Sequence, residues 1–237
     1  KQTIPAPAQF FQQMIIPANL ETTRKFYQTD EELIEDIAKG YRKVIKDLYD
    51  AGCRHVQFDD CTWGMFCDKN YWEARQEDSV SLEEEAEKYL RLNNLALENA
   101  PEDLVITTHV CRGNYLSTWA SSGGYEPIAP FLFANENVSA YYLEFDDERS
   151  GGFEPLRFVS DDKKVVLGLV TSKSPILEEK EVIKKRIAKA AKYIPLDRLY
   201  LSPQCGFASC EIGNKLTEEE QWAKHALVKE IAKEVWG

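Results

Sequence analysis

Short apolar runs alternate with amphipathic helical segments along the chain, and this alternation limits the folds that it can adopt. The runs have the length and composition of buried strands, and they fall at residues 2–7, 54–60, 104–111, 140–147, 164–171 and 198–203. Strands that alternate with helices form a parallel sheet through right-handed crossovers. The sequence therefore predicts an α/β protein.

The segments between these runs carry helix signals of different strength. A capping box, Thr29-x-x-Glu32, opens the first long helix, and a second one, Thr217-x-x-Glu220, opens the last. Further helices are expected from Ser81, over 127–137, after the turn at 150–152 and over 178–194. Residues 61–72, CTWGMFCDKNYW, are expected to form an aromatic loop.

Composition and charge narrow the class of protein. With 237 residues and 43% hydrophobic content, the chain can bury one large core, so we expect a single domain over residues 1–237. The net charge of −11 and the even spread of Lys and Arg argue against a nucleic-acid partner. No apolar stretch approaches the roughly 20 residues that span a bilayer, and the first residues lack a signal-peptide core. We therefore expect a cytoplasmic protein with no membrane partner and with its six cysteines reduced.

Four side chains of the types that bind zinc end or follow the predicted strands. His109 and Cys111 lie two residues apart, so on a regular strand both point to the same face. Glu144 ends a later apolar run, where a carboxylate needs a partner, and Cys205 follows the last run. Together the four residues suggest a metal site, because all are of types that bind zinc.

Each of these residues also has a purely structural explanation. Cys111 could be a small core residue, and the histidine could simply be hydrogen-bonded at the end of its strand. Glu144 could form a salt bridge with Arg149 or Arg112. If one of the four is not a ligand, Cys210 is the substitute that we expect.

The positions of the four residues distinguish between two ways of closing the sheet. In an open sheet the ends of the strands diverge, whereas a barrel brings many strand ends around one mouth. Side chains on the third, fourth and sixth predicted strands can converge only if the sheet curls. We therefore predict a TIM (β/α)8 barrel, with this chain supplying about six of the eight βα units and the first two strands missing from its front.

Four segments carry a resemblance to a known family. QFDD, THVC, YYLEFDDERSGG and LSPQCGFAS resemble segments of the C-terminal catalytic barrel of cobalamin-independent methionine synthase, and the match is better still to its shorter, single-barrel relatives. The resemblance runs from Gln2 to the last helix. It implies Zn²⁺ as the cofactor, bound by His109, Cys111, Glu144 and Cys205, and it implies that Asp59 binds the amino group of homocysteine.

The resemblance also implies a reaction and its small-molecule partners. Zinc would hold the thiol of homocysteine as a thiolate, which would attack the methyl group of a donor such as 5-methyltetrahydrofolate and give methionine. Trp63, Tyr115 and Trp119 are candidate surfaces on which a flat donor could stack, although aromatic residues in long loops also serve to anchor the loop.

One departure from the family concerns the proton donor. The larger synthases have a histidine after the strand that ends here at residue 171, and this chain has Thr171, Ser172 and Lys173 instead. Either Asp146 or Lys173 serves as the acid, or the methyl donor differs and needs no such proton.

Three other functions remain open at this point. A related zinc barrel could alkylate a different thiol, such as coenzyme M. The barrel could instead be a non-catalytic zinc or thiol-binding module with a closed structural site. A decarboxylase of the uroporphyrinogen type, which needs no metal, has a similar barrel.

Overall fold

A single parallel sheet organises the molecule. The structure, a computed structural model, describes residues 1–75 and 81–237. The sheet has the strand order β1-β2-β3-β4-β5-β6, so consecutive strands along the chain are neighbours. The strands are β1 (Gln2–Pro5), β2 (His55–Asp60), β3 (Val105–Val110), β4 (Ala140–Glu144), β5 (Lys164–Val170) and β6 (Leu199–Pro203). This order is that of successive barrel strands, and all six predicted strands are confirmed.

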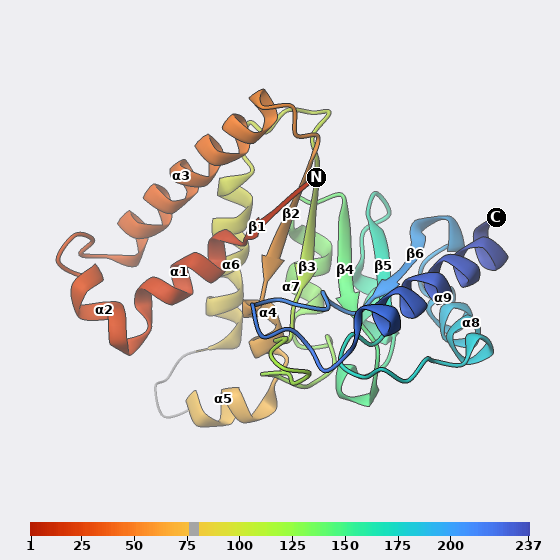
Figure 1. The fold of residues 1–237 in the computed structure, drawn as a ribbon. Helices are drawn as coiled ribbons and strands as arrows, with labels where there is room; N and C mark the ends of the chain where they lie inside the picture. Colours follow the sequence, from red (N-terminus) through yellow and green to blue (C-terminus); the bar gives the residue numbers. More distant parts are fainter. Residues whose placement is uncertain (76–80) are drawn as a thin grey trace.

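Helices cover the outer face of the sheet (Figure 1). The helices of the described residues are α1 (Pro7–Ile15), α2 (Pro17–Thr23), α3 (Asp30–Asp50), α4 (Thr62–Phe66), α5 (Lys69–Arg75), α6 (Leu82–Ala96), α7 (Ala129–Asn135), α8 (Lys180–Ala190) and α9 (Glu218–Trp236), of which α4 and α5 lie beyond the carboxyl ends of the strands. The described part of the chain also contains the short 3-10 helices η2 (Glu148–Ser150), η3 (Glu154–Phe158) and η4 (Leu196–Arg198). Both predicted capping boxes form, at the start of α3 and of α9.

Two predictions about the connections were wrong. Residues 61–72 do not form a loop, because they contain α4 and the start of α5. Trp63 and Phe66 of α4 are buried, so packing on the core stabilises a helix too short to show a periodic pattern in the sequence. After residues 150–152 the chain forms only the 3-10 helix η3 rather than an α-helix.

The sheet curls so that its inner face becomes the wall of a barrel. Val56 and Phe58 of β2 are buried beneath the helices, whereas Gln57 and Asp59 alternate with them and face the other way. The ammonium group of Lys1, next to β1, lies 4.9 Å from the ring of Tyr142 in β4. Residues from the two edges of the sheet also line one cavity of about 180 Å³, which runs from Lys1, before β1, to residues 202–206 at the end of β6. Together with the solved relatives reported below, this curvature identifies a TIM-barrel sheet.

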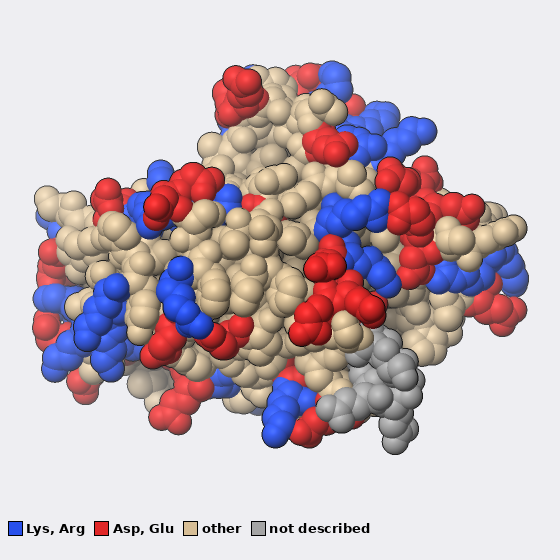
Figure 2. Space-filling model, turned by 180° about the vertical axis from the view of Figure 1, so that it is seen from behind, with Lys and Arg blue, Asp and Glu red and all other residues tan. Residues whose placement is uncertain are grey.

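The surface carries charges of both signs. On the face shown in Figure 2, acidic and basic side chains surround an uncharged central area. Several charged side chains of the described residues form ion pairs one helical turn apart, such as Lys43 with Asp47. None of the helices in the described residues is long and apolar enough to cross a membrane.

A buried polar network joins β2 to two of the covering helices. The Nδ2 group of Asn93 donates hydrogen bonds to Asp60 (3.1 Å) and to Glu136 (3.0 Å), and its Oδ1 accepts one from the backbone N–H of Ala8. All three polar side chains are fully buried. Burial, with a smaller contribution from the negative charge of Asp60, raises the pKa of Glu136 to about 8.

The raised pKa of Glu136 predicts a pH dependence of stability. The folded protein holds this proton more tightly than the unfolded chain, so the stabilisation is complete below the ordinary glutamate pKa and is lost as the pH rises through about 8. We expect Glu136→Gln to reduce the loss of stability between about pH 5 and about pH 9, as measured by urea unfolding at both pH values. An unchanged pH dependence in the variant would show that Glu136 is ionised in the folded state across this range.

Candidate metal centre

Four side chains meet at the carboxyl end of the sheet. They are His109 in β3, Cys111 just after it, Glu144 at the end of β4 and Cys205 just after β6. Their ligand atoms all lie within 4.8 Å of one another. The structure thus brings together the complete set of predicted ligands, and Cys210, the predicted substitute, is not part of the cluster.

His109 is oriented by a carboxylate on the neighbouring strand. Asp59 is paired with it in register, and Asp59 Oδ1 lies 2.9 Å from His109 Nδ1. A proton on Nδ1 leaves the lone pair of Nε2 directed at the cluster. Nε2 is buried, has no hydrogen-bond partner and lies 3.6 Å from Oε1 of Glu144. A buried nitrogen without a partner, fixed by a carboxylate on its other side, is the arrangement that metal-binding histidines have in proteins.

Glu144 is fully buried and is held on every side. Its Oε1 accepts a hydrogen bond from the backbone N–H of Arg112 (3.1 Å), and its Oε2 is 3.1 Å from Nη2 of Arg149. The Tyr125 hydroxyl accepts from the backbone N–H of Glu144 and donates to its carbonyl oxygen. Burial opposes ionisation of Glu144, but the nearby His109 and the backbone N–H of Arg112 prevail and lower its pKa. The alternative of a salt bridge to Arg149 is therefore present alongside the cluster rather than in place of it.

The two thiols of the cluster retain their protons when no cation is bound. The hydrogen bond with Cys205 lowers the pKa of Cys111, but the neighbouring Cys61 and burial prevail and raise it. The hydrogen bond with Cys111 and burial likewise raise the pKa of Cys205. A metal ion must displace these protons, so affinity for metal rises with pH.

A glycine that the sequence analysis did not single out lets Cys205 reach the cluster. A Cβ atom on Gly168 in β5 would lie 2.8 Å from Cα of Gln204 and 2.8 Å from the carbonyl oxygen of Leu143. Both contacts are with backbone atoms, so a side chain at this position would require the backbone to move. Gly168 thereby allows the chain before Cys205 to pack against β5. Its only signal in the sequence is a glycine within a strand of large apolar residues.

The two predicted acidic site residues differ in their surroundings. The side chain of Asp59 is 44% exposed and faces the barrel mouth beside His109. The side chain of Asp146 is 1% exposed and is paired with Arg149 at 3.0 Å. Burial raises the pKa of Asp146, while Arg149 opposes that shift.

The three predicted stacking residues do not behave alike. Tyr115 is 59% exposed and Trp119 is 50% exposed. The guanidinium of Arg149 lies 4.9 Å from the Trp119 ring. Trp63 is fully buried in α4 and packs edge-on against Phe66. The prediction that Trp63 offers a surface to a substrate was therefore wrong, because its ring belongs to the core.

Loops from three strand ends are joined above the cluster. Lys173 Nζ donates to Oδ1 of Asn114 (3.0 Å), and Nδ2 of Asn214 donates to the same oxygen (2.9 Å). Asn114 Nδ2 in turn donates to the carbonyl oxygen of Gly206 and the hydroxyl of Ser209, each at 2.7 Å. Lys173 is one of the residues predicted to replace the histidine of the larger synthases. Its hydrogen bond to Asn114 places it among the loops at the mouth of the barrel.

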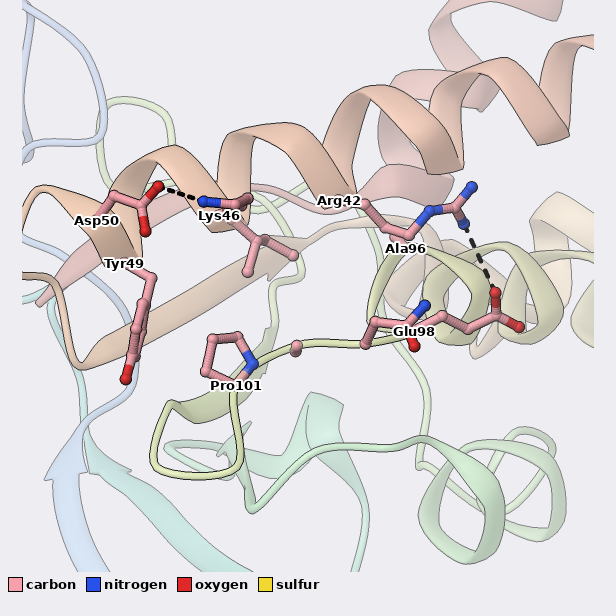
Figure 3. Close-up of a pocket in the computed structure, with 10 residues that line it drawn as sticks. Arg42, Lys46, Tyr49, Asp50, Ala96, Glu98 and Pro101 are labelled. Carbon is pink, nitrogen blue, oxygen red and sulfur yellow. Dashed lines mark hydrogen bonds and ion pairs between the residues drawn. The ribbon is translucent and has the colours of Figure 1, made fainter.

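A larger hollow lies at the opposite end of the strands. It has a volume of about 400 Å³ and is lined by residues of α3 and of the segment after α6. Figure 3 shows that its charged side chains are already paired, Lys46 with Asp50 and Arg42 with Glu98. It contains no member of the cluster, and barrels of this kind carry their active sites at the carboxyl end of the strands. The cluster is therefore the better candidate site.

A parallel α/β barrel sheet with a His, Cys, Glu, Cys cluster at its carboxyl end defines the class of this protein. A family model described as "Cobalamin-independent synthase, Catalytic domain" matches residues 22–232. The chain belongs to this family, which confirms the resemblance seen in the sequence.

Individual relatives agree with this assignment. The chain is 45% identical over 238 residues to the uncharacterized protein YxjG of Bacillus subtilis, covering all of this chain and 61% of that protein. It is 26% identical to the methionine synthase of Pyrococcus horikoshii over 77% of this chain and 45% of that one. A crystal structure of a Listeria monocytogenes protein, assigned as a vitamin-B12 independent methionine synthase, superposes with a TM-score of 0.74 and 37% identity over all of this chain and 64% of that chain. The chain thus spans less than two thirds of the length of these proteins.

Proposed function

We propose that this chain is the catalytic part of a zinc-dependent methyltransferase that activates a thiol, homocysteine, for methylation to methionine. The observation that carries the proposal is the convergence of His109, Cys111, Glu144 and Cys205 within 4.8 Å, with one imidazole nitrogen left without a partner. Two thiols, one imidazole and one carboxylate are a ligand set that suits zinc. Bound zinc would supply the Lewis acidity that keeps a substrate thiol deprotonated near neutral pH.

The residues around the cluster suit an amino thiol. Asp59 presents a half-exposed carboxylate next to His109, where it can accept hydrogen bonds from an ammonium group while it also orients the ring. Glu144 is fixed by Arg149 and by the backbone of Arg112, so it stays in place as the substrate enters. Cys111 and Cys205 add negative charge to the site, which favours a nucleophilic sulfur.

The methyl donor would approach from the loops above the cluster. Tyr115 and Trp119 expose aromatic surface on which a flat molecule such as 5-methyltetrahydrofolate can stack. Lys173 Nζ donates a hydrogen bond over the same mouth and is the group that we propose in place of the family's histidine. A lysine there supplies positive charge and a proton for a leaving group that bears negative charge.

The proposal is tested by X-ray absorption at the zinc edge with and without homocysteine. We expect stoichiometric zinc with two sulfur ligands, from Cys111 and Cys205, and a third sulfur when homocysteine is added. An unchanged spectrum with zinc fully bound would indicate a closed, structural site. A third sulfur that comes from coenzyme M and not from homocysteine would reassign the substrate, and a chain that binds no zinc would overturn the proposal.

Replacing Asp59 separates its two contacts. We expect Asp59→Asn to weaken homocysteine binding by about 10–100-fold while zinc remains bound, because the amide keeps an oxygen for the His109 N–H but loses the charge that attracts an ammonium. Calorimetric titration with homocysteine and a zinc assay on the same sample check both parts. Loss of zinc with unchanged affinity for homocysteine in the remaining holoprotein would assign Asp59 to the metal alone.

A further inference from the structure

A third thiol lies against the candidate metal centre. Cys61 directly follows β2, as Cys111 directly follows β3. The register pairs Asp60 with Val110, so Cys61 and Cys111 are the next two residues along neighbouring strands. Neighbouring strands lie about 4.8 Å apart, which is within the roughly 4.4–6.8 Å that separates the Cα atoms of a disulfide.

The packing of α4 keeps the two thiols together. The backbone N–H of Cys111 donates to the carbonyl oxygen of Asp60 (3.0 Å), the residue just before Cys61. A Cβ atom on Gly64 would lie 2.4 Å from the carbonyl oxygen of Cys111, so only glycine lets α4 approach this closely. The backbone N–H of Cys61 is also fixed, because it donates to Oε1 of Gln9 at 3.1 Å. Cys61 is partly exposed, whereas Cys111 is buried behind it.

We propose that Cys61 and Cys111 form an oxidation site at which a hydroperoxide closes a reversible disulfide. The Cys61 thiolate attacks one oxygen of hydrogen peroxide, becomes a sulfenic acid and releases hydroxide. The Cys111 thiol then attacks the sulfenic sulfur, the S–S bond forms and water leaves. The two sulfurs lose two electrons in total, and the peroxide is reduced to two molecules of water once the hydroxide takes up a proton.

The disulfide removes Cys111 from the cluster, so oxidation would disable the centre until a thiol reductant restores it. The pairing depends only on the two cysteines and not on the proposed function. Formation of the disulfide is therefore measured on metal-free protein, so that the result does not depend on whether the zinc assignment is right.

The test is peroxide treatment of the 237-residue chain after removal of metal by a chelator, followed by digestion without reduction and mass spectrometry. We expect a peptide that links Cys61 to Cys111, located by fragment ions, which disappears on treatment with dithiothreitol. Cys53→Ser is the matched control, since Cys53 is also partly exposed and free but lies before β2. The link should persist in Cys53→Ser and be absent from Cys61→Ser.

Three outcomes would overturn the proposal. A link between Cys111 and Cys205 alone would show that the cluster oxidises without Cys61. A sulfinic acid on Cys61 without any link would show that Cys111 cannot reach it. Six unmodified thiols after treatment would show that the site does not react.

Discussion

Cys111→Ser is expected to weaken zinc binding by at least about 100-fold and to abolish thiol methylation. The serine hydroxyl retains its proton near neutral pH, so the site would lose one anionic ligand of the four that converge there. His109→Ala should have the same effect, because its Nε2 is directed at the cluster. Competition with a chromophoric zinc chelator measures the affinity, and methionine formation from homocysteine measures the activity.

The control for this prediction is a cysteine that lies near the cluster in sequence, on the loop that carries Cys205, but is not part of it. Cys210 lies five residues beyond Cys205 and outside the cluster, so Cys210→Ser should keep both zinc and activity. Full activity with retained zinc in both Cys111→Ser and His109→Ala would refute the assignment of the site.

Glu178→Ala is expected to destabilise the fold by about 3–5 kcal/mol. The side chain of Lys224 in α9 is completely buried, and its ammonium is 3.1 Å from both oxygens of Glu178. Without Glu178 the buried charge keeps only the carbonyl oxygen of Ile176, at 2.8 Å. Glu178 also accepts the backbone N–H of Thr171, so the loop that carries Lys173 should loosen as well. Denaturant unfolding measures the loss.

A surface ion pair provides the comparison for Glu178→Ala. Lys180 and Glu230 are 2.7 Å apart, with side chains 33% and 59% exposed. Glu230→Ala should lower the free energy of unfolding far less than Glu178→Ala does, because an exposed pair gains little over its hydrated ions. Equal losses from the two substitutions would mean that Lys224 finds water when Glu178 is removed.

The sheet and the cluster of four candidate ligands could be predicted because both follow from local pattern and topology. Each strand is an apolar run of ordinary length, and parallel strands place their carboxyl ends at one edge. Polar side chains that end such runs and point into the barrel therefore converge there. That rule placed Glu144 and Cys205 beside His109 across gaps of many residues.

The features that could not be predicted depend on contacts between distant segments. Whether Trp63 faces a substrate or the core depends on how α4 packs. The short helix α4 is stabilised by packing of its buried side chains on the core. The proximity of Cys61 to Cys111 depends on the register between β2 and β3, which cannot be read from the sequence. Gly168 matters only because Gln204 passes over it.

The hydrogen bonds around Asn114 have a consequence for how this protein could diversify. The four cluster residues belong to strand ends, whereas Asn114 joins Lys173, Asn214 and residues 206–209 from the loops above them. Mutations in these loops can alter the roof of the site without moving the sheet below it. The scaffold is therefore modular: under the proposed function, descendants that keep the same nucleophile would acquire new alkyl donors by exchanging a few loop side chains.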